Sequence, residues 1–157
     1  MRHRFAADRT LGKLAKWLRV LGYDTIFESD TASNSFYENL EIDRILLTRT
    51  GKIQKKFPLN ITVFIASNFL DAQLRQVIEE IGIRRAEIQP FSRCIPCNLK
   101  IVATGKADVF GKVPDYIWET QQRFHRCKRC GRIYWAGSHT ERSLERINQL
   151  FSELNRI

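Results

Sequence analysis

The chain of 157 residues has no apolar run near the roughly 20 residues that a membrane-spanning helix needs. Its N-terminus, MRHRFAADRT, lacks the apolar stretch of a secretory signal, so we expect the protein to reside in the cytoplasm. Internal repeats and low-complexity tracts are also lacking. With 43% hydrophobic and 27% charged residues, the chain suits one soluble domain, alone or with a small appendage.

Acidic residues are scarce, because 17 Asp and Glu face 26 Lys and Arg and give a formal net charge of +9. The excess is uneven: residues 1–91 carry +3, residues 92–139 carry +6, and the last eighteen residues balance to zero. A basic region favours a polyanionic partner, most simply nucleic acid. Two alternatives stay open, namely a solubilising surface without a specific partner and a basic face that meets an acidic protein.

Short apolar runs predict strands at residues 5–7, 25–27, 45–48 and 61–66. Apolar residues at helical spacing predict amphipathic helices over residues 11–21 and 70–81, which end at Gly22 and Gly82. Between them we expect a brief helix at residues 36–42 and a basic turn with Lys52, Lys55 and Lys56. Strands that alternate with helices at these spacings predict an α/β fold with a parallel sheet covered on both faces.

A change of composition at residues 90–92 predicts a boundary between a first unit, residues 1–91, and a second unit, residues 92–157. Near the C-terminus, Leu144, Ile147, Phe151 and Leu154 mark a further helix, for which Thr140 is a candidate cap. We expect this helix to pack back on one of the two units.

The four cysteines form two pairs, Cys94 with Cys97 and Cys127 with Cys130, separated by twenty-nine residues. Two residues between cysteines let both sulfurs reach one ion, and two such knuckles supply the four thiolates of a tetrahedral zinc site. Gly131 suits the positive φ that such a knuckle needs. Two disulfides or a redox motif are the alternatives, but disulfides are disfavoured in the cytosol and a redox motif does not need a second pair. The pattern therefore predicts a structural zinc ribbon.

Basic and aromatic residues surround the second pair, which suits contact with phosphate and stacking on bases. Lys13, Lys16 and Arg19 fall largely off the apolar stripe of the first helix and are expected to face solvent or a ligand. Tyr134 and Trp135 could instead fill the small core of the ribbon. The predicted RNA-binding residues are Lys13, Lys16, Arg19, Arg49, Arg126, Lys128, Arg129, Arg132, Tyr134 and His139.

Several segments, taken in order, resemble the Mut-seven C-terminal ribonuclease domain family. They are FAADRTLGKLAKWLRVLGYDT, RILLTRT, SRCIPCN and HRCKRCGRIYWAGSH. The resemblance extends over roughly residues 3–145 and implies a PIN-like nuclease domain followed by a zinc ribbon. It also implies cleavage of RNA by carboxylates that hold Mg²⁺ or Mn²⁺ at the carboxyl edge of the sheet, where such ions activate water.

The resemblance implies catalytic roles for some acids of this chain, but at two positions the chain lacks the acid that the family has. Asp8 matches the first acid, and it also suits a helix cap. Thr50 and Asn34 stand where the family has acids. Neighbouring or later acids that could substitute are Asp30, Glu38 and Asp71, of which Asp71 equally suits a helix cap. Asp24 matches the family pattern but suits a structural role at the start of a strand.

A divalent ion held by one carboxylate and neutral oxygens loses most of its charge compensation. The sequence therefore predicts RNA binding, within a ribonucleoprotein complex or alone, more firmly than it predicts cleavage. A module that kept the nuclease scaffold and lost the chemistry is the alternative.

Overall fold

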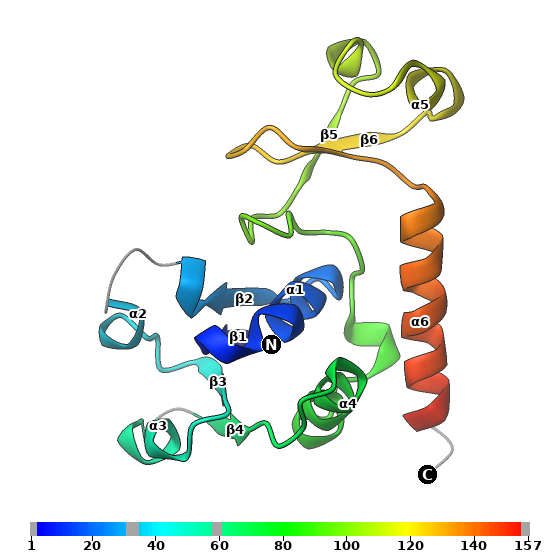
Figure 1. Ribbon diagram of the computed structural model, residues 1–157. Coiled ribbons are helices and arrows are strands. Elements are labelled where there is room, and N and C mark those ends of the chain that lie inside the picture. The colour runs from blue at the N-terminus through cyan, green and yellow to red at the C-terminus, as the bar shows by residue number, and fades with distance from the viewer. Residues whose placement is uncertain (1–2, 31–34, 58–60, 155–157) are drawn as a thin grey trace.

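Four short apolar segments form a parallel sheet, as the sequence predicts. The computed structural model (Figure 1) describes residues 3–30, 35–57 and 61–154. The strands are β1 (Arg4–Ala7), β2 (Asp24–Phe27), β3 (Arg44–Thr48) and β4 (Thr62–Phe64), in the order β2-β1-β3-β4. Every neighbouring pair is parallel, so the carboxyl ends of all four strands meet at one edge.

Helices cover both faces of the sheet (Figure 1). On one face, α1 (Gly12–Val20) and α4 (Leu70–Ile81) pack against the strand residues that include Phe5 and Leu47. Side chains alternate between the faces of a strand. Ala6 and Leu46 therefore meet the opposite layer, which is built by α2 (Ser35–Glu38) and α3 (Gly51–Lys56).

Two helices differ from the sequence-based expectation. The segment predicted as a basic turn forms α3, because Ile53 and Phe57 lie four residues apart and both pack on the α2 side of the sheet. This apolar face is difficult to recognise in the sequence, because the segment also contains Lys52, Lys55 and Lys56. The helix expected at residues 36–42 ends at Glu38, and β4 is shorter than the apolar run that predicts it.

Amide side chains cover the two edge strands. The backbone N–H of Thr25 in β2 donates to Oδ1 of Asn98 at 3.0 Å. Beside β4, Nε2 of Gln76 donates to the carbonyl oxygen of Phe64 at 2.7 Å. Unpaired backbone groups at a sheet edge invite pairing with other chains, and these amides reduce that exposure.

The part of the second unit that precedes the C-terminal helix contains an antiparallel sheet, β5 (Val102–Thr104), β6 (Phe124–Arg126) and β7 (Ile133–Tyr134), and the helix α5 (Asp115–Thr120). Its buried apolar residues in the described part of the chain are Val109, Val113, Ile117 and Phe124. Trp118, Ile133 and Trp135 are partly buried against them, so Trp135 belongs to the ribbon core. Short 3-10 turns complete the chain at η1 (Arg9–Leu11), η2 (Glu28–Asp30), η3 (Arg85–Glu87) and η4 (Ala107–Val109).

The C-terminal helix α6 (Ser138–Leu154) runs from the second unit back along the first (Figure 1). Ile147, Leu150 and Phe151 join the apolar core that α1 and α4 form with the sheet, which confirms that the helix packs back on one unit. The helix begins at Ser138, so Thr140 lies inside the first turn rather than at the cap. Among the helices that the structure describes, none is both long and apolar enough to cross a bilayer.

Candidate functional site

Polar residues gather where the first three strands end. Ala7 pairs in register with Phe27 on one side and with Leu47 on the other. The next residues along the chain, Asp8, Glu28 and Thr48, therefore lie in one row at the carboxyl edge of the sheet. Since consecutive strands lie on opposite sides of β1, this row is at the position where ligands bind in open α/β sheets.

Asp8 is buried, with 2% of its surface exposed, and its carboxylate accepts four hydrogen bonds. Oδ1 accepts from the backbone N–H and the hydroxyl of Thr10, which confirms the predicted role as a helix cap, here of η1. Oδ2 accepts from the Thr48 hydroxyl at 2.7 Å and from the Arg49 backbone N–H at 2.9 Å. The carboxylate thus joins the ends of β1 and β3, and its four lone-pair positions are occupied.

Glu28 is a second acid at this edge that the sequence analysis missed. Its side chain is 11% exposed and accepts three hydrogen bonds from Arg9, through the backbone N–H, Nε and Nη2, and one from the Tyr37 hydroxyl. Burial alone would raise the pKa of Glu28, but the hydrogen bonds from Arg9 outweigh it and lower the pKa below its usual value. Its place directly after an apolar strand, which it shares with Asp8, is the signal that could have identified it.

Among the described residues, no other candidate acid joins Asp8 and Glu28 in a group of three that could share a metal ion. Asp30 accepts a hydrogen bond from Nη2 of Arg19 at 2.7 Å, and Asp71 in the first turn of α4 pairs with Arg146 of α6. Phe69 is the N-cap of α4, so the predicted capping role of Asp71 is wrong. Glu38 is exposed at the end of α2.

The two positions at which acids were expected contribute no carboxylate. Asn34 lies outside the described residues. Thr50 is exposed, and its side chain makes no capping hydrogen bond to α3. Its backbone N–H instead donates to the Thr48 hydroxyl at 3.0 Å.

Asp24 lies at the opposite edge, at the start of β2, and is structural. Its carboxylate accepts hydrogen bonds from Arg44, Arg4 and Asn98. Burial favours a raised pKa, but the bonds from Arg44 and Asn98 prevail and lower the pKa of Asp24 to about 2. The carboxylate therefore stays ionised at neutral pH and holds the start of β2 against Arg44 of β3.

We expect Asp8→Asn to lower the free energy of unfolding by about 2–3 kcal/mol, because an amide cannot accept all four hydrogen bonds in a buried position. The measurement is urea unfolding followed by circular dichroism. Glu38→Gln, which removes one exposed carboxylate, is the matched control and should change stability by less than about 0.5 kcal/mol. Equal stability of the two variants would show that the Asp8 carboxylate is not a structural link.

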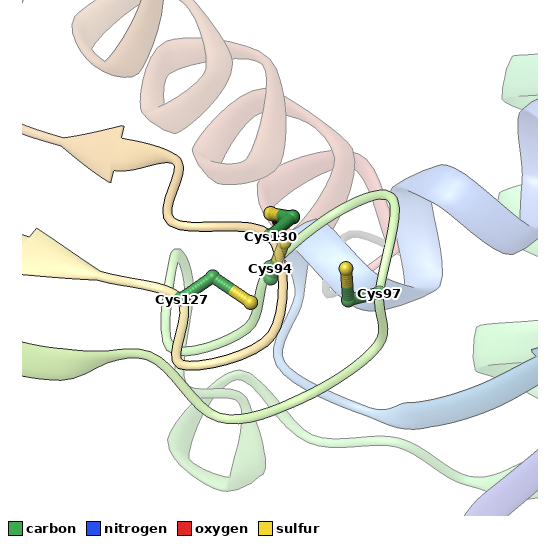
Figure 2. A group of neighbouring side chains, drawn as sticks. All are labelled: Cys94, Cys97, Cys127 and Cys130. Atoms are coloured by element: carbon green, nitrogen blue, oxygen red, sulfur yellow. Dashed lines mark hydrogen bonds between the residues drawn. The ribbon is translucent and has the colours of Figure 1, made fainter.

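The two cysteine pairs lie on facing loops, and Figure 2 shows their four side chains gathered between these loops. In the first knuckle, residues 94–99, Asn98 N–H donates to the Cys94 carbonyl and Cys94 N–H to that of Leu99, both at 2.8 Å. The second knuckle, residues 127–132, repeats the pattern with Gly131, Cys127 and Arg132. Gly131 has a φ of 72°, which confirms its predicted conformation, and Asn98 takes the equivalent place with a φ of 61°.

The four sulfurs fit a tetrahedral metal ion. They all lie within 4.8 Å of one another, and those of Cys94 and Cys130 are 3.7 Å apart. Four thiolates around zinc at about 2.3 Å place their sulfurs about 3.8 Å apart. None of the cysteines forms a disulfide. The cluster could therefore hold a metal ion such as zinc.

Local hydrogen bonds also suit thiolate ligands. Burial would raise the pKa of Cys127, but the backbone N–H groups of Cys130 and Arg129 donate to its sulfur and lower the pKa to about 7. Burial and the neighbouring sulfurs raise the pKa of Cys97 to about 12. Without a cation, the four thiols therefore cannot all lose their protons easily. A metal cation at the centre of the four sulfurs allows all of them to be thiolates, because a coordinating thiol loses its proton. The Tyr134 hydroxyl donates to the Cys94 sulfur at 3.1 Å, which ties β7 to the first knuckle.

Most of the predicted RNA-binding cations are exposed. Lys13 and Lys16 lie on the outer face of α1, and His139 lies in the first turn of α6. Arg49 is half-buried at the carboxyl edge, and its Nε has no hydrogen-bond partner among the residues that the structure describes. The second knuckle and the adjoining end of β6 carry Arg126, Lys128, Arg129 and Arg132, which are all exposed.

The sequence predicts that Arg19 faces solvent or a ligand, and the structure shows that it does not face solvent. It is 4% exposed and points from α1 into the junction of the two units. Its guanidinium donates to the carbonyl oxygens of Thr25, Ile95 and Pro96 and to the carboxylate of Asp30. The helical spacing alone predicts exposure wrongly here, because a guanidinium that donates to several acceptors can be buried outside the apolar stripe of a helix.

Comparison with known protein families matches residues 3–147 of the chain to the Mut7-C RNAse domain. The chain belongs to this family. The match spans both the α/β unit with Asp8 and the unit with the four cysteines, which confirms the resemblance found in the sequence. Comparisons with curated proteins and with solved structures find no match to the chain.

In this Mut7-C domain, the family relationship supports a role related to RNA and to nucleases. The two features described above then have distinct chemistry. The carboxyl edge holds the buried Asp8 and the half-buried Glu28, both with internal partners, and the four-cysteine cluster is a candidate metal centre surrounded by exposed cations.

Proposed function

We propose that this Mut7-C domain binds single-stranded RNA through the knuckle cations, a name used here for Arg126, Lys128, Arg129 and Arg132. The observation that carries the proposal is that all four are exposed and none forms an ion pair within the described part of the chain. Cations without internal partners are available to replace the counterions of a phosphate backbone.

Other arginines of the molecule differ in this respect. Arg4, Arg9, Arg44 and Arg84, for example, each lie within 3.3 Å of a carboxylate oxygen. Each of these pairs is nearly neutral, so it adds little to an attraction for RNA. Among the described residues, no acid pairs with the knuckle cations, so their positive charge remains available to phosphate.

The four-cysteine cluster, in this proposal, holds one structural zinc ion. Cys94, Cys97, Cys127 and Cys130 supply all four ligands, so no coordination position is left for water or substrate. The ion instead fixes the backbone of the second knuckle. A fixed backbone lowers the entropy that the knuckle cations lose when they order on RNA.

The carboxyl edge, in the same proposal, contributes little cleavage. Mg²⁺ and Mn²⁺ need free carboxylate oxygens. Asp8 and Glu28 are the two acids that could hold such an ion, but Thr10, Thr48, Arg49, Arg9 and Tyr37 occupy their oxygens. Metal binding would have to break these bonds, and Thr50 supplies no further charge.

Charge reversal tests the binding face. We expect Lys128→Glu with Arg132→Glu to weaken binding of a labelled single-stranded RNA by at least about tenfold, since both substitutions also repel phosphate. Fluorescence anisotropy at one low salt concentration measures the change.

The matched control is Lys112→Glu with Arg142→Glu, which changes the net charge equally at two exposed cations. Lys112 and Arg142 belong to the parts of the chain near α5 and α6, whereas the turn between β6 and β7 projects away from both helices (Figure 1). We expect the control to weaken binding only slightly. Equal losses in the two double variants would mean that net charge, not the knuckle, attracts RNA.

A further inference from the structure

A cavity of about 540 Å³ lies between the edge strand β2 and the two knuckles. Ile26 and Phe27 of β2 line one side, and Pro96 and Leu99 of the first knuckle line another. Asp30, which follows β2, and Arg129 of the second knuckle also face it. Its volume is within the range of about 300–1,000 Å³ that is usual for small-molecule sites.

The walls of this cavity are held in place by hydrogen bonds between the units. Asn98 accepts from Thr25 N–H and donates to the Asp24 carboxylate at 2.7 Å. Arg19 bonds to carbonyl oxygens on both sides, in β2 and in the first knuckle. A site whose walls are fixed before binding loses little entropy when a ligand enters.

The charge of the lining favours an anion. Four arginines line the cavity, Arg19, Arg44, Arg93 and Arg129, against two aspartates, Asp24 and Asp30. Both aspartates already pair with arginines, Asp24 with Arg44 and Asp30 with Arg19. Arg129 has no ion pair within the described residues and is exposed, so its planar guanidinium is free to bind a phosphate group in bidentate fashion.

The apolar walls favour more than a bare phosphate. Ile26, Phe27, Pro96 and Leu99 offer a surface for a base or a ribose ring. Oδ1 of Asp30 has no hydrogen-bond partner among the described residues, while Oδ2 is bound to Arg19. Oδ1 can accept a hydrogen bond from a ribose hydroxyl or from a base N–H.

We propose that this cavity binds one nucleotide of the RNA strand, with its phosphate on Arg129 and its base and ribose against the walls built by β2 and the first knuckle. This inference rests on the proposed function and adds to it a binding site for one nucleotide. The cavity adjoins the knuckle cations at Arg129 and extends along β2, which ends beside Glu28 at the carboxyl edge. The bound RNA strand therefore runs from the second knuckle along β2 towards the row of residues that contains Asp8.

A pair of single substitutions separates the cavity from general attraction. Arg129→Ala and Arg126→Ala each remove one exposed cation from the same hairpin, but only Arg129 lines the cavity. We expect Arg129→Ala to weaken RNA binding about tenfold and Arg126→Ala about twofold, because a bidentate phosphate contact exceeds a screened charge. Equal losses would overturn the proposal.

A second experiment fills the cavity without changing charge. We expect Leu99→Trp to weaken RNA binding severalfold with the melting temperature and metal content retained, and adenosine monophosphate to compete with RNA for the wild type but not for this variant. Inorganic phosphate, without base or ribose, should compete less than the nucleotide. Unchanged RNA affinity in Leu99→Trp, or equal competition by phosphate, would contradict the nucleotide site while wild-type RNA binding stands. If the wild type itself does not bind RNA, the proposed function fails instead.

Discussion

Removal of the metal ion proposed for the four cysteines is expected to unfold residues 92–136 and to leave most of the helical structure intact. The ion would join the two knuckles, which come from distant parts of the chain and whose four cysteine sulfurs lie within 4.8 Å of one another. In isolated zinc-finger peptides, the apparent free energy of zinc binding is about 10–16 kcal/mol.

The apolar core beside the knuckles is too small to replace the ion. In the described part of the chain it consists of four buried residues, Val109, Val113, Ile117 and Phe124, with partly buried rings around them. Burial of one such side chain contributes about 1.5–3 kcal/mol, against about 1–2 kcal/mol of backbone entropy for each ordered residue. The larger core formed by the sheet, α1, α4 and α6 contains none of the four cysteines, so we expect it to persist without the ion.

The two units can be observed separately during chelation. Near-ultraviolet circular dichroism should lose the signals of Trp118 and Trp135, which pack in the second unit, while the far-ultraviolet helix signal falls little. Zinc should restore the signal, and magnesium, which prefers oxygen ligands, should not. A metal-depleted protein that keeps its full near-ultraviolet spectrum would show that the ribbon folds without the ion.

Arg19→Ala is expected to lower the free energy of unfolding by about 3–5 kcal/mol, the usual cost of removing one partner from a buried polar network. The substitution leaves three carbonyl oxygens, those of Thr25, Ile95 and Pro96, without their donor. Most of the loss comes from the carbonyl oxygen of Thr25, which is buried, and from that of Ile95, which is partly buried. The Asp30 carboxylate is 46% exposed, so water takes over part of its lost contact.

Thermal unfolding measures this prediction, since a loss of 1 kcal/mol lowers the melting temperature of a protein of this size by about 2–4 °C. Lys16→Ala is the matched control, because Lys16 lies on the same helix and is exposed. The control should change stability by no more than about 0.5 kcal/mol. Similar melting temperatures for the two variants would mean that Arg19 does not hold the units together.

Local sequence patterns predict much of the first unit. The strands that become β1 and β3 stand out because they lie inside the sheet and bury apolar residues on both faces, so their runs are largely apolar. The stripes of α1 and α4 stand out because each helix buries one face. In contrast, β5, β6 and β7 have two or three residues each, and their pairing across the chain leaves no periodic signal.

The candidate site is predictable where a ligand set has a fixed spacing. The four cysteines are an example, because two residues between sulfurs are a local requirement of the knuckle. The partners of polar residues depend on three-dimensional neighbours instead. Arg19 becomes buried because carbonyl oxygens from a distant segment meet it, and Glu28 joins Asp8 because parallel strands align their ends. Neither the burial of Arg19 nor the proximity of Glu28 to Asp8 can be predicted from neighbouring residues in the sequence.

The central claim is that uncompensated cations on a metal-stabilised knuckle bind RNA beside a carboxyl edge that does not cut it. The most direct test is the affinity of the wild-type protein for single-stranded RNA, measured across a series of salt concentrations with Mn²⁺ present. We predict intact RNA, and binding whose logarithm falls linearly with the logarithm of salt concentration, at a slope near −0.7 for each phosphate contacted. Affinity that does not respond to salt, or rapid loss of full-length RNA that an Asp8→Asn variant abolishes, would contradict the account.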